Sequence, residues 1–123
     1  MFSLSSTFRY YYYSSATDTR KGFDGLCGLV HAEIGRGPVS GEVFIFVNHQ
    51  RNKIKLLHWE AGGFVLYYKR LERGTFEMPR VCSQGKPCQI SWSSLMLIVE
   101  AISTEKYKQR RRYVINNLLP SSQ

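Results

Sequence analysis

The amino-acid sequence predicts an α+β fold, in which a small antiparallel sheet packs with an N-terminal and a C-terminal helix. Three observations predict it. Residues 43–71 contain three strand-like runs separated by two short links rich in turn-forming residues. Residues 18–34 and residues 95–102 each carry apolar side chains at helical spacing. Because short links favour antiparallel pairing, the runs are expected to form a three-stranded meander, to which an N-terminal strand is added.

The N-terminal part of the chain predicts a strand followed by a helix. Residues 8–13 (FRYYYY) are rich in aromatic side chains, which favour pleated surfaces. Thr17 is suited to cap the helix, and Asp18 lies in its first turn, where the helix dipole favours a negative charge. A Gly-Arg-Gly-Pro sequence ends the helix after Ile34. Its apolar stripe is expected to comprise Phe23, Leu26, Cys27, Val30 and Ile34.

Three glycines, Gly22, Gly25 and Gly28, are spaced three apart within this predicted helix. Each costs roughly 1 kcal/mol relative to alanine in a helix interior. Close packing of the helix on a sheet or on a second helix would offset this cost. A loop over residues 22–25 that shortens the helix would avoid it. The spacing matches neither of the common glycine-rich phosphate-binding motifs.

The links of the meander predict its register. With residues 48–52 as the first loop, the facing pairs are Val47 with Lys53, Phe46 with Ile54 and Phe44 with Leu56. With residues 60–63 as the second link, they are Trp59 with Phe64, Leu57 with Leu66, Lys55 with Tyr68 and Lys53 with Arg70. One face would be core, with Phe44, Phe46, Ile54, Leu56, Val65 and Tyr67. The other would mix basic and aromatic groups, with Lys53, Lys55, Trp59, Phe64, Tyr68 and Arg70, besides Leu57 and Leu66. A slip of one residue would exchange the faces.

Beyond the meander, the sequence predicts a polar loop over residues 80–89 and a final helix. Ser91, Ser93 or Ser94 is suited to cap this helix. Its apolar face is expected to comprise Leu95, Ile98, Val99 and Ile102. We expect residues 1–104 to form a single domain and residues 105–123 to form a basic C-terminal tail.

The charge of the chain is positive and unevenly distributed. The net charge is +8, and residues 106–112 (KYKQRRR) hold five of the seventeen Lys and Arg residues. This balance favours contact with nucleic acid or another acidic partner, although a solvated basic tail is an alternative. Trp59 and Tyr68 would add stacking surfaces, and Arg73 would extend the basic patch. The candidate DNA-binding residues are Arg51, Lys53, Lys55, Lys69, Arg70, Lys106, Lys108, Arg110, Arg111 and Arg112, of which Lys69 is expected to point toward the other face.

The sequence lacks the patterns of a metal centre, a cofactor site or a catalytic site. Cys82 and Cys88 are separated by five residues, more than the two to four typical of zinc knuckles. We treat the three cysteines as free thiols and the protein as cytoplasmic. Cys27 and His31 lie one helical turn apart, but a thiol on an apolar stripe is usually inert. The carboxylates do not converge as metal-assisted phosphoryl transfer requires. No apolar run approaches the roughly 20 residues that span a bilayer.

Several segments together resemble one known family. They are Thr17-Asp18-x-Arg20-Lys21-Gly22-Phe23-Asp24-Gly25-Leu26, then Val43-Phe44-Ile45-Phe46 with Asn48, then Lys53-Ile54-Lys55-Leu56-Leu57 with Trp59, then Phe64-x-Leu66-Tyr67-Tyr68-Lys69-Arg70-Leu71-Glu72-x-Gly74-x-Phe76. In this order they resemble the TnpB accessory protein of the insertion-sequence family numbered sixty-six. The resemblance runs from Phe8 to Ile102 and does not include the tail. It implies a small auxiliary factor of a bacterial mobile element, beside a larger transposase with an acidic catalytic triad and another small accessory protein. It supplies no catalytic residues.

The sequence and the resemblance together predict a non-enzymatic accessory protein that supports transposition. Its expected partners are DNA, the transposase and the other accessory protein of the same element, with no membrane partner. An alternative is a pure protein-interaction module that does not bind DNA. Its docking surface would be the N-terminal helix, with Arg20, Lys21, Gly22, Gly25 and Gly28. Arg20 and Lys21 are also second-rank candidates for DNA contact.

Overall fold

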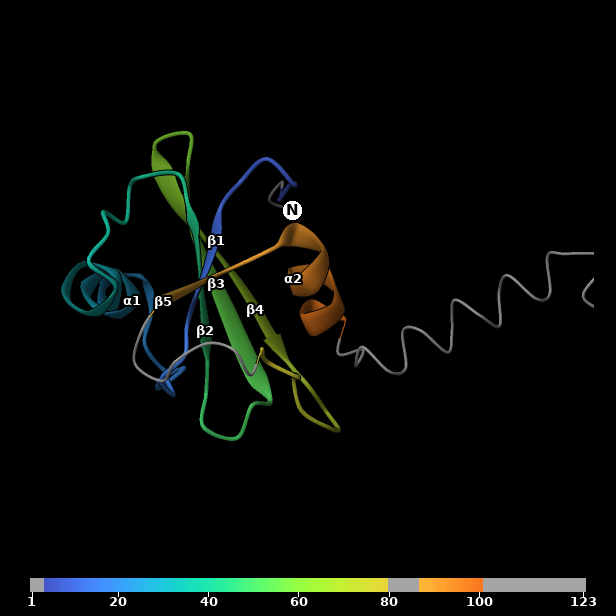
Figure 1. The fold of residues 1–123 in the computed structure, drawn as a ribbon. Helices are drawn as coiled ribbons and strands as arrows, with labels where there is room; N and C mark the ends of the chain where they lie inside the picture. The colour runs from blue at the N-terminus through green and yellow to red at the C-terminus, as the bar shows by residue number, and fades with distance from the viewer. Residues whose placement is uncertain (1–3, 80–86, 101–123) are drawn as a thin grey trace, which may run out of the picture.

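The computed structural model describes residues 4–79 and 87–100 as a three-layered α+β fold (Figure 1). Five strands form one sheet in the order β4-β3-β2-β1-β5. Helix α1 and the π-helical turn η1 that follows it cover one face, and helix α2 covers the other. The elements are β1 (Tyr10–Tyr13), α1 (Phe23–Leu29), η1 (Val30–Ile34), β2 (Val43–Val47), β3 (Lys53–Glu60), β4 (Gly63–Arg70), β5 (Pro87–Ile90) and α2 (Trp92–Val99).

The sheet is mixed, so the prediction of a purely antiparallel sheet is wrong. The predicted meander of β2, β3 and β4 is confirmed. Strand β1, however, pairs with β2 in parallel, because α1 and η1 carry the chain back to the end of the sheet where β1 began. Strand β5 pairs antiparallel with β1 and includes residues that the sequence predicted to be a polar loop.

The two hairpins differ in how well the sequence predicted their register. Between β3 and β4 the predicted pairs are confirmed, for example Lys53 with Arg70. Between β2 and β3 the prediction is wrong by one residue, because Val47 faces Ile54. The cause is Asn48, which continues the hairpin by donating its backbone N–H to the carbonyl of Lys53 over 3.2 Å. The loop is therefore one residue shorter than predicted.

This slip gives the sheet a core on each face instead of on one. Phe44 and Phe46 lie on the same face as Lys53 and Lys55, opposite to the predicted arrangement. Beneath α1 and η1 the buried cluster comprises Tyr11, Tyr13, Leu26, Val30, Ile34, Phe44, Phe46 and Leu57. Beneath α2 it comprises Tyr10, Tyr12, Val43, Ile45, Val47, Ile54, Leu56, Phe76, Met78, Ile90, Leu95 and Ile98.

The helices bury most of their predicted apolar faces, and Ile102 of the second face lies outside the described residues. Helix α1 begins at Phe23 with Gly22 as its N-cap. The prediction that residues 18–21 belong to the helix, with Thr17 as its cap, is therefore wrong. Phe23 is 46% exposed and does not belong to the buried stripe. Gly35 ends η1 with a φ of 74°, a left-handed conformation that suits glycine. The predicted capping of the last helix is confirmed for Ser91, whose side chain accepts the backbone N–H of Ser94.

Candidate nucleic-acid interface

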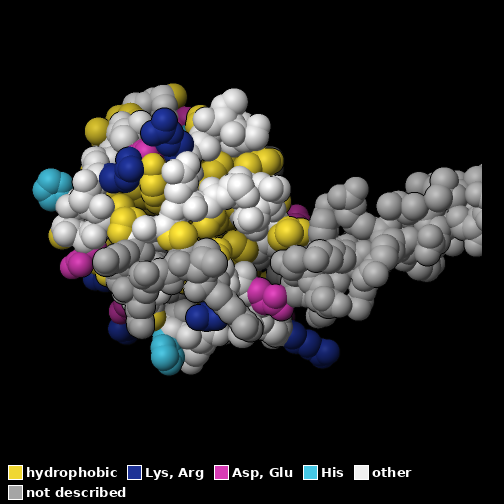
Figure 2. Space-filling model, in the orientation of Figure 1, with side chains coloured by type: hydrophobic (Ala, Val, Ile, Leu, Met, Phe, Trp, Pro, Cys, Tyr) yellow, Lys and Arg dark blue, Asp and Glu magenta, His cyan; other side chains and the backbone are white. Residues whose placement is uncertain are grey.

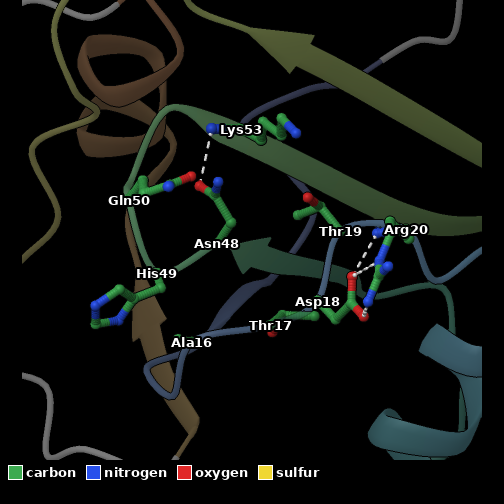
Figure 3. Close-up of a pocket in the computed structure, with 9 residues that line it drawn as sticks. All are labelled: Ala16, Thr17, Asp18, Thr19, Arg20, Asn48, His49, Gln50 and Lys53. Atoms are coloured by element: carbon green, nitrogen blue, oxygen red, sulfur yellow. Dashed lines mark hydrogen bonds and ion pairs between the residues drawn. The ribbon is translucent and has the colours of Figure 1, made fainter.

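The carboxyl ends of β1 and β2 lie at the same edge of the sheet, because these two strands are parallel. The segments that follow them are joined by the N–H of Thr17, which donates to the carbonyl of Val47 over 2.9 Å. Between the segments lies a shallow pocket of about 390 Å³. In open α/β sheets, ligands bind at this edge. The pocket, drawn in Figure 3, is lined by Ala16, Thr17, Asp18, Thr19, Arg20, Asn48, His49, Gln50 and Lys53.

Asn48 organises the loop between β2 and β3. Its Oδ1 accepts the backbone N–H groups of Asn52 and Lys53, each over 3.0 Å, and its Nδ2 donates to Oδ1 of Asn52 over 2.7 Å. The backbone of Arg51 adopts a left-handed φ of 58° at the turn. The Arg51 carbonyl also accepts the N–H of Phe76 over 2.6 Å. These contacts fix the path of the loop, while His49, Gln50 and Arg51 stay exposed to solvent.

The segment after β1 is held by an ion pair between neighbours in sequence. Arg20 donates to both carboxylate oxygens of Asp18, and its own backbone N–H donates to Oδ1 over 3.0 Å. Figure 3 shows these contacts on the rim of the pocket. The Arg20 guanidinium first, and then its backbone N–H, lower the pKa of Asp18 to about 2. The side chain of Arg20 is 90% exposed, so it still presents its charge to solvent.

Basic side chains gather at this end of the sheet. We define the basic edge as residues 16–21, 48–53 and 70–73, which adjoin because the N–H of Leu71 donates to the Asn52 carbonyl over 2.8 Å. Figure 2 shows Lys and Arg side chains on the rim where Figure 1 draws the loop between β2 and β3. The basic edge holds two acids, Asp18 and Glu72, against the cations of Arg20, Lys21, Arg51, Lys53, Arg70 and Arg73.

Comparison with known proteins identifies the family. A family model described as "IS66 Orf2 like protein" matches residues 8–109. The chain belongs to this family. Two similar proteins come from Sinorhizobium fredii (strain NBRC 101917 / NGR234). The uncharacterized protein y4jC is 30% identical over 93 residues, which cover 76% of this chain and 78% of y4jC. The uncharacterized protein y4hO is 30% identical over 86 residues, which cover 70% of this chain and 73% of y4hO. No solved structure matches the chain.

Membership of the IS66 Orf2-like family confirms the resemblance predicted from the sequence. It identifies the chain as an insertion-sequence accessory protein. Segments that carried the resemblance, at residues 17–20, at Asn48 and at Lys53, line the pocket at the basic edge.

Three of the predicted DNA-binding residues lie together on the basic edge of this IS66 Orf2-like protein. Arg51 is exposed, and its charge lies close enough to Tyr12 to oppose partly the rise that burial causes in the pKa of that hydroxyl. Lys53 is half-buried and lines the pocket. Arg70 faces Lys53 across the hairpin, and its side chain is 62% exposed, 3.7 Å from a carboxylate oxygen of Glu72.

Lys55 lies on the same sheet face but is only 8% exposed. Its ammonium donates to the Lys21 carbonyl over 2.9 Å and lies 4.9 Å from the centre of the Tyr68 ring. The chain that enters α1 covers it. The sequence placed Lys55 on a basic and aromatic face open to DNA, but the structure buries this side chain, and we leave Lys55 out of the candidate interface.

Lys69 points toward the other face of the sheet, as the register predicted. Its ammonium donates over 2.8 Å to the carbonyl of Val99 at the end of α2, where the helix dipole favours a cation. It is thus used inside the fold. The remaining candidates, which lie outside the described residues, are Lys106, Lys108, Arg110, Arg111 and Arg112.

The three glycines of the predicted docking helix have different surroundings. Gly22 is the N-cap, so the helix begins later than predicted, but residues 23–25 are helical and do not form the loop that one alternative expected. A Cβ added at Gly22 or at Gly28 would meet no heavy atom within 4 Å. At Gly25 it would lie 3.1 Å from Cβ of Lys21, whose side chain crosses the helix there. Close packing against the sheet therefore does not explain the glycines.

Neither of the two cysteines within the described residues is an activated nucleophile. Cys27 is a half-buried free thiol, and its pKa is raised by burial and further by the charge of Asp24. Little thiolate would form near neutral pH. Cys88 is disulfide-bonded, so the expectation of free thiols is wrong at that position. Cys82 lies outside the described residues.

Residues 4–79 and 87–100 contain neither a cluster of metal ligands nor a membrane-spanning helix. No group of three or more His, Cys, Asp or Glu side chains could hold a metal ion. Nor does any helix in these ranges have the length and apolar character to cross a membrane.

Sequence reasoning missed two features of the pocket. It did not assign His49, an exposed residue of the pocket lining. It also did not foresee that Asn48 holds the loop. A signal existed, because an Asn at the end of a strand often accepts backbone N–H groups two or more residues on and starts a turn.

The buried ammonium of Lys55 predicts a contrast with its neighbour. We expect Lys55→Met to lower the free energy of unfolding by about 1.5–3 kcal/mol, the usual worth of a hydrogen bond from a charged donor. Lys53→Met is the matched control and should change it by less than about 0.5 kcal/mol. Urea titration of both variants measures the difference. Equal losses would contradict the inequivalence of the two lysines.

The contacts of Asn48 predict a loop that fails when its side chain is removed. We expect Asn48→Ala to lower the free energy of unfolding by about 1–3 kcal/mol, because half-buried N–H groups lose their acceptor. Gln50→Ala removes an exposed side chain from the same loop and should have little effect. Thermal unfolding, with hydrogen exchange at Asn52 and Lys53, measures both. A Gln50→Ala variant as unstable as Asn48→Ala would refute this role.

The lowered pKa of Asp18 predicts the pH at which its ion pair with Arg20 is lost. Because the folded-state pKa of about 2 lies below the ordinary 3.8, the pair is intact above pH 4 and is lost as pH falls through 2. We expect the carboxyl carbon of Asp18 to titrate in NMR near that value. In Arg20→Gln the pKa should rise part of the way toward 3.8, since the backbone N–H of residue 20 still donates. An unchanged pKa in that variant would show that the guanidinium is not the main cause.

Proposed function

We propose that this insertion-sequence accessory protein supports transposition without catalysis, by holding the DNA backbone along its basic edge. The observation that carries the proposal is the convergence of three separate segments on one rim of the sheet, with six Lys or Arg side chains and two acids. Four of these cations, Lys21, Arg51, Lys53 and Arg73, form no salt bridge with any of the described residues. Unpaired cations are suited to phosphate oxygens.

The rigidity of the rim supports this proposal. The loop that carries Arg51 is fixed by Asn48 and by the N–H of Phe76 before any ligand arrives. A preorganised loop loses less conformational entropy on binding than a free one. Contacts of this kind position a protein on the backbone and carry no sequence information by themselves.

An exposed aromatic ring extends the same surface. Tyr68 is 50% exposed and lies two residues before Arg70 on the same face of β4. An unpaired base could stack on such a ring next to the phosphate contacts. Trp59 is less suited, because it is half-buried with its ring centre 4.8 Å from that of Phe64. Distorted or single-stranded DNA is therefore a better fit than an undisturbed duplex.

A second candidate is contact with the transposase or the other accessory protein through α1. Phe23 is 46% exposed at the start of this helix, and Gly28 borders open space. This surface is separate from the basic edge, apart from Arg20 and Lys21 at its start. Binding of the purified transposase that Phe23→Ala weakens, with DNA binding unchanged, would support it.

The basic edge predicts strongly salt-dependent DNA binding. We expect the double variant Arg51→Ala, Lys53→Ala to weaken binding and to reduce the slope of log K against log salt by about 0.9 for each lost phosphate contact. Arg9→Ala is the matched control, since this exposed arginine lies before β1 at the opposite end of the sheet. Fluorescence anisotropy on single-stranded and duplex DNA, over a range of salt, measures the slopes. Equal slopes for the double variant and the control would exclude the basic edge.

A further variant separates the edge from the tail. Glutamine at Lys106, Lys108, Arg110, Arg111 and Arg112, in the full chain, removes the charge of the tail alone. If this variant loses all DNA binding while the edge variant keeps the wild-type slope, the DNA contact belongs to the tail. If both lower the slope, the two surfaces act together.

A further inference from the structure

Strand β4 is the terminal strand of the sheet, with β3 on one side only. The N–H of Leu71 donates to the Asn52 carbonyl. Because hydrogen-bonded and non-bonded pairs alternate along antiparallel strands, every second residue of β4, counted back from Leu71, bonds to β3. The intervening residues direct their backbone N–H and carbonyl groups away from the sheet. Within residues 4–79 and 87–100, no backbone hydrogen bond satisfies that side of the strand. These outward residues are Phe64, Leu66, Tyr68 and Arg70.

The two edges of the sheet are protected very differently. At the far edge, β5 has four residues and begins with a proline, both features that discourage pairing with another chain. At the near edge, β4 has eight residues, no proline, and charged side chains only at Lys69 and Arg70. The Lys69 ammonium donates one of its three N–H groups to Val99, which holds this side chain toward α2 and away from the edge, but its charge remains. Long, apolar, unprotected edges are templates for a further strand.

We propose that β4 pairs antiparallel with β4 of a second copy of this chain, so that the two sheets join into one. The edge is self-complementary, because a two-fold axis near Leu66 sets its outward donors and acceptors against the same groups of the partner. The β4 strand of each copy would also cover half-exposed apolar side chains at the edge of the other copy, such as Phe64 and Leu66.

The charges of the hairpin agree with this arrangement. Lys69 and Glu60 lie on the same face of the sheet, at opposite ends of the β3–β4 hairpin. Antiparallel pairing brings the Lys69 end of one copy beside the turn that carries Glu60, 34% exposed, in the other. Parallel pairing would instead place like charges together. For two copies of this chain, the charges therefore favour antiparallel over parallel pairing of the β4 strands.

Two variants at one position test the pairing of backbones. Leu66→Pro removes an N–H that points away from β3, a place where an edge strand tolerates proline. Leu66→Thr keeps the N–H and the strand propensity but removes the apolar side chain. We expect the full-length wild type to be dimeric by light scattering and sedimentation, with dissociation on dilution over roughly a hundredfold range of concentration. Leu66→Pro should be monomeric and folded, and Leu66→Thr should still dimerise.

Other outcomes overturn the proposal. A wild type that stays monomeric at the highest concentration excludes the dimer, and leaves the edge to another protein. If the Leu66→Pro variant still dimerises, the dimer interface lies elsewhere on the surface. Equal loss in both variants shows an apolar contact without strand pairing. Should Leu66→Pro fail to fold, hydrogen exchange in the wild type decides. The amides of Leu66 and Tyr68 must become protected as concentration rises, and unchanged exchange refutes the pairing.

Discussion

The parallel pairing of β1 with β2 is the constraint on which the rest of the structure depends. It requires a crossover, and the segment 23–34 supplies one as α1 and η1. It also buries β1 on both faces, so that all four tyrosines are at most 9% exposed. Two of them have polar partners: the hydroxyl of Tyr10 donates to the carbonyl of Ser5 over 2.6 Å, and the guanidinium of Arg36 lies over the Tyr11 ring, 4.0 Å from its centre. Because parallel strands end together, this pairing also brings the two loops of the basic edge to one rim.

A single side chain then decides how the cations are distributed. By continuing the hairpin at Asn48, the chain sets Phe46 opposite Lys55 and commits that lysine to the face covered by α1. An ammonium under a helix must find a partner, and it finds the carbonyl of Lys21. Lys53, two residues closer to the loop, stays at the rim with solvent access. The length of the loop between β2 and β3 thus decides that Lys55 is buried and that Lys53 reaches solvent, although both residues are lysines.

The sequence was informative where a pattern is local. The meander, the β3–β4 register, most of the apolar face of each helix and a serine cap near Ser91 depend on neighbouring residues, and these could be predicted. The parallel partner of β1 could not, because FRYYYY has no polar alternation to show which strand it joins. The β2–β3 register failed for a related reason, since the side-chain bonds of Asn48, and not composition, set the loop length. At the candidate site, the placement of Arg51, Lys53 and Arg70 at one end of the sheet could be predicted, because cations at loop ends are visible in the sequence. The burial of Lys55 could not, because the segment that enters α1 covers it from a distant part of the chain.

The free edge of β4 and the basic edge meet at Arg70, yet their physical chemistry differs. Backbone pairing between strands depends little on salt, whereas contact with phosphates weakens steeply as salt rises. In an antiparallel pair the partner's β4 runs the opposite way, so its carboxyl end, with its own basic edge, lies at the far end of the joined sheet. A dimer would therefore present two separated basic rims instead of one continuous stripe. Such a body is suited to holding two stretches of DNA apart at a fixed distance, which a monomer with the same charges could not do.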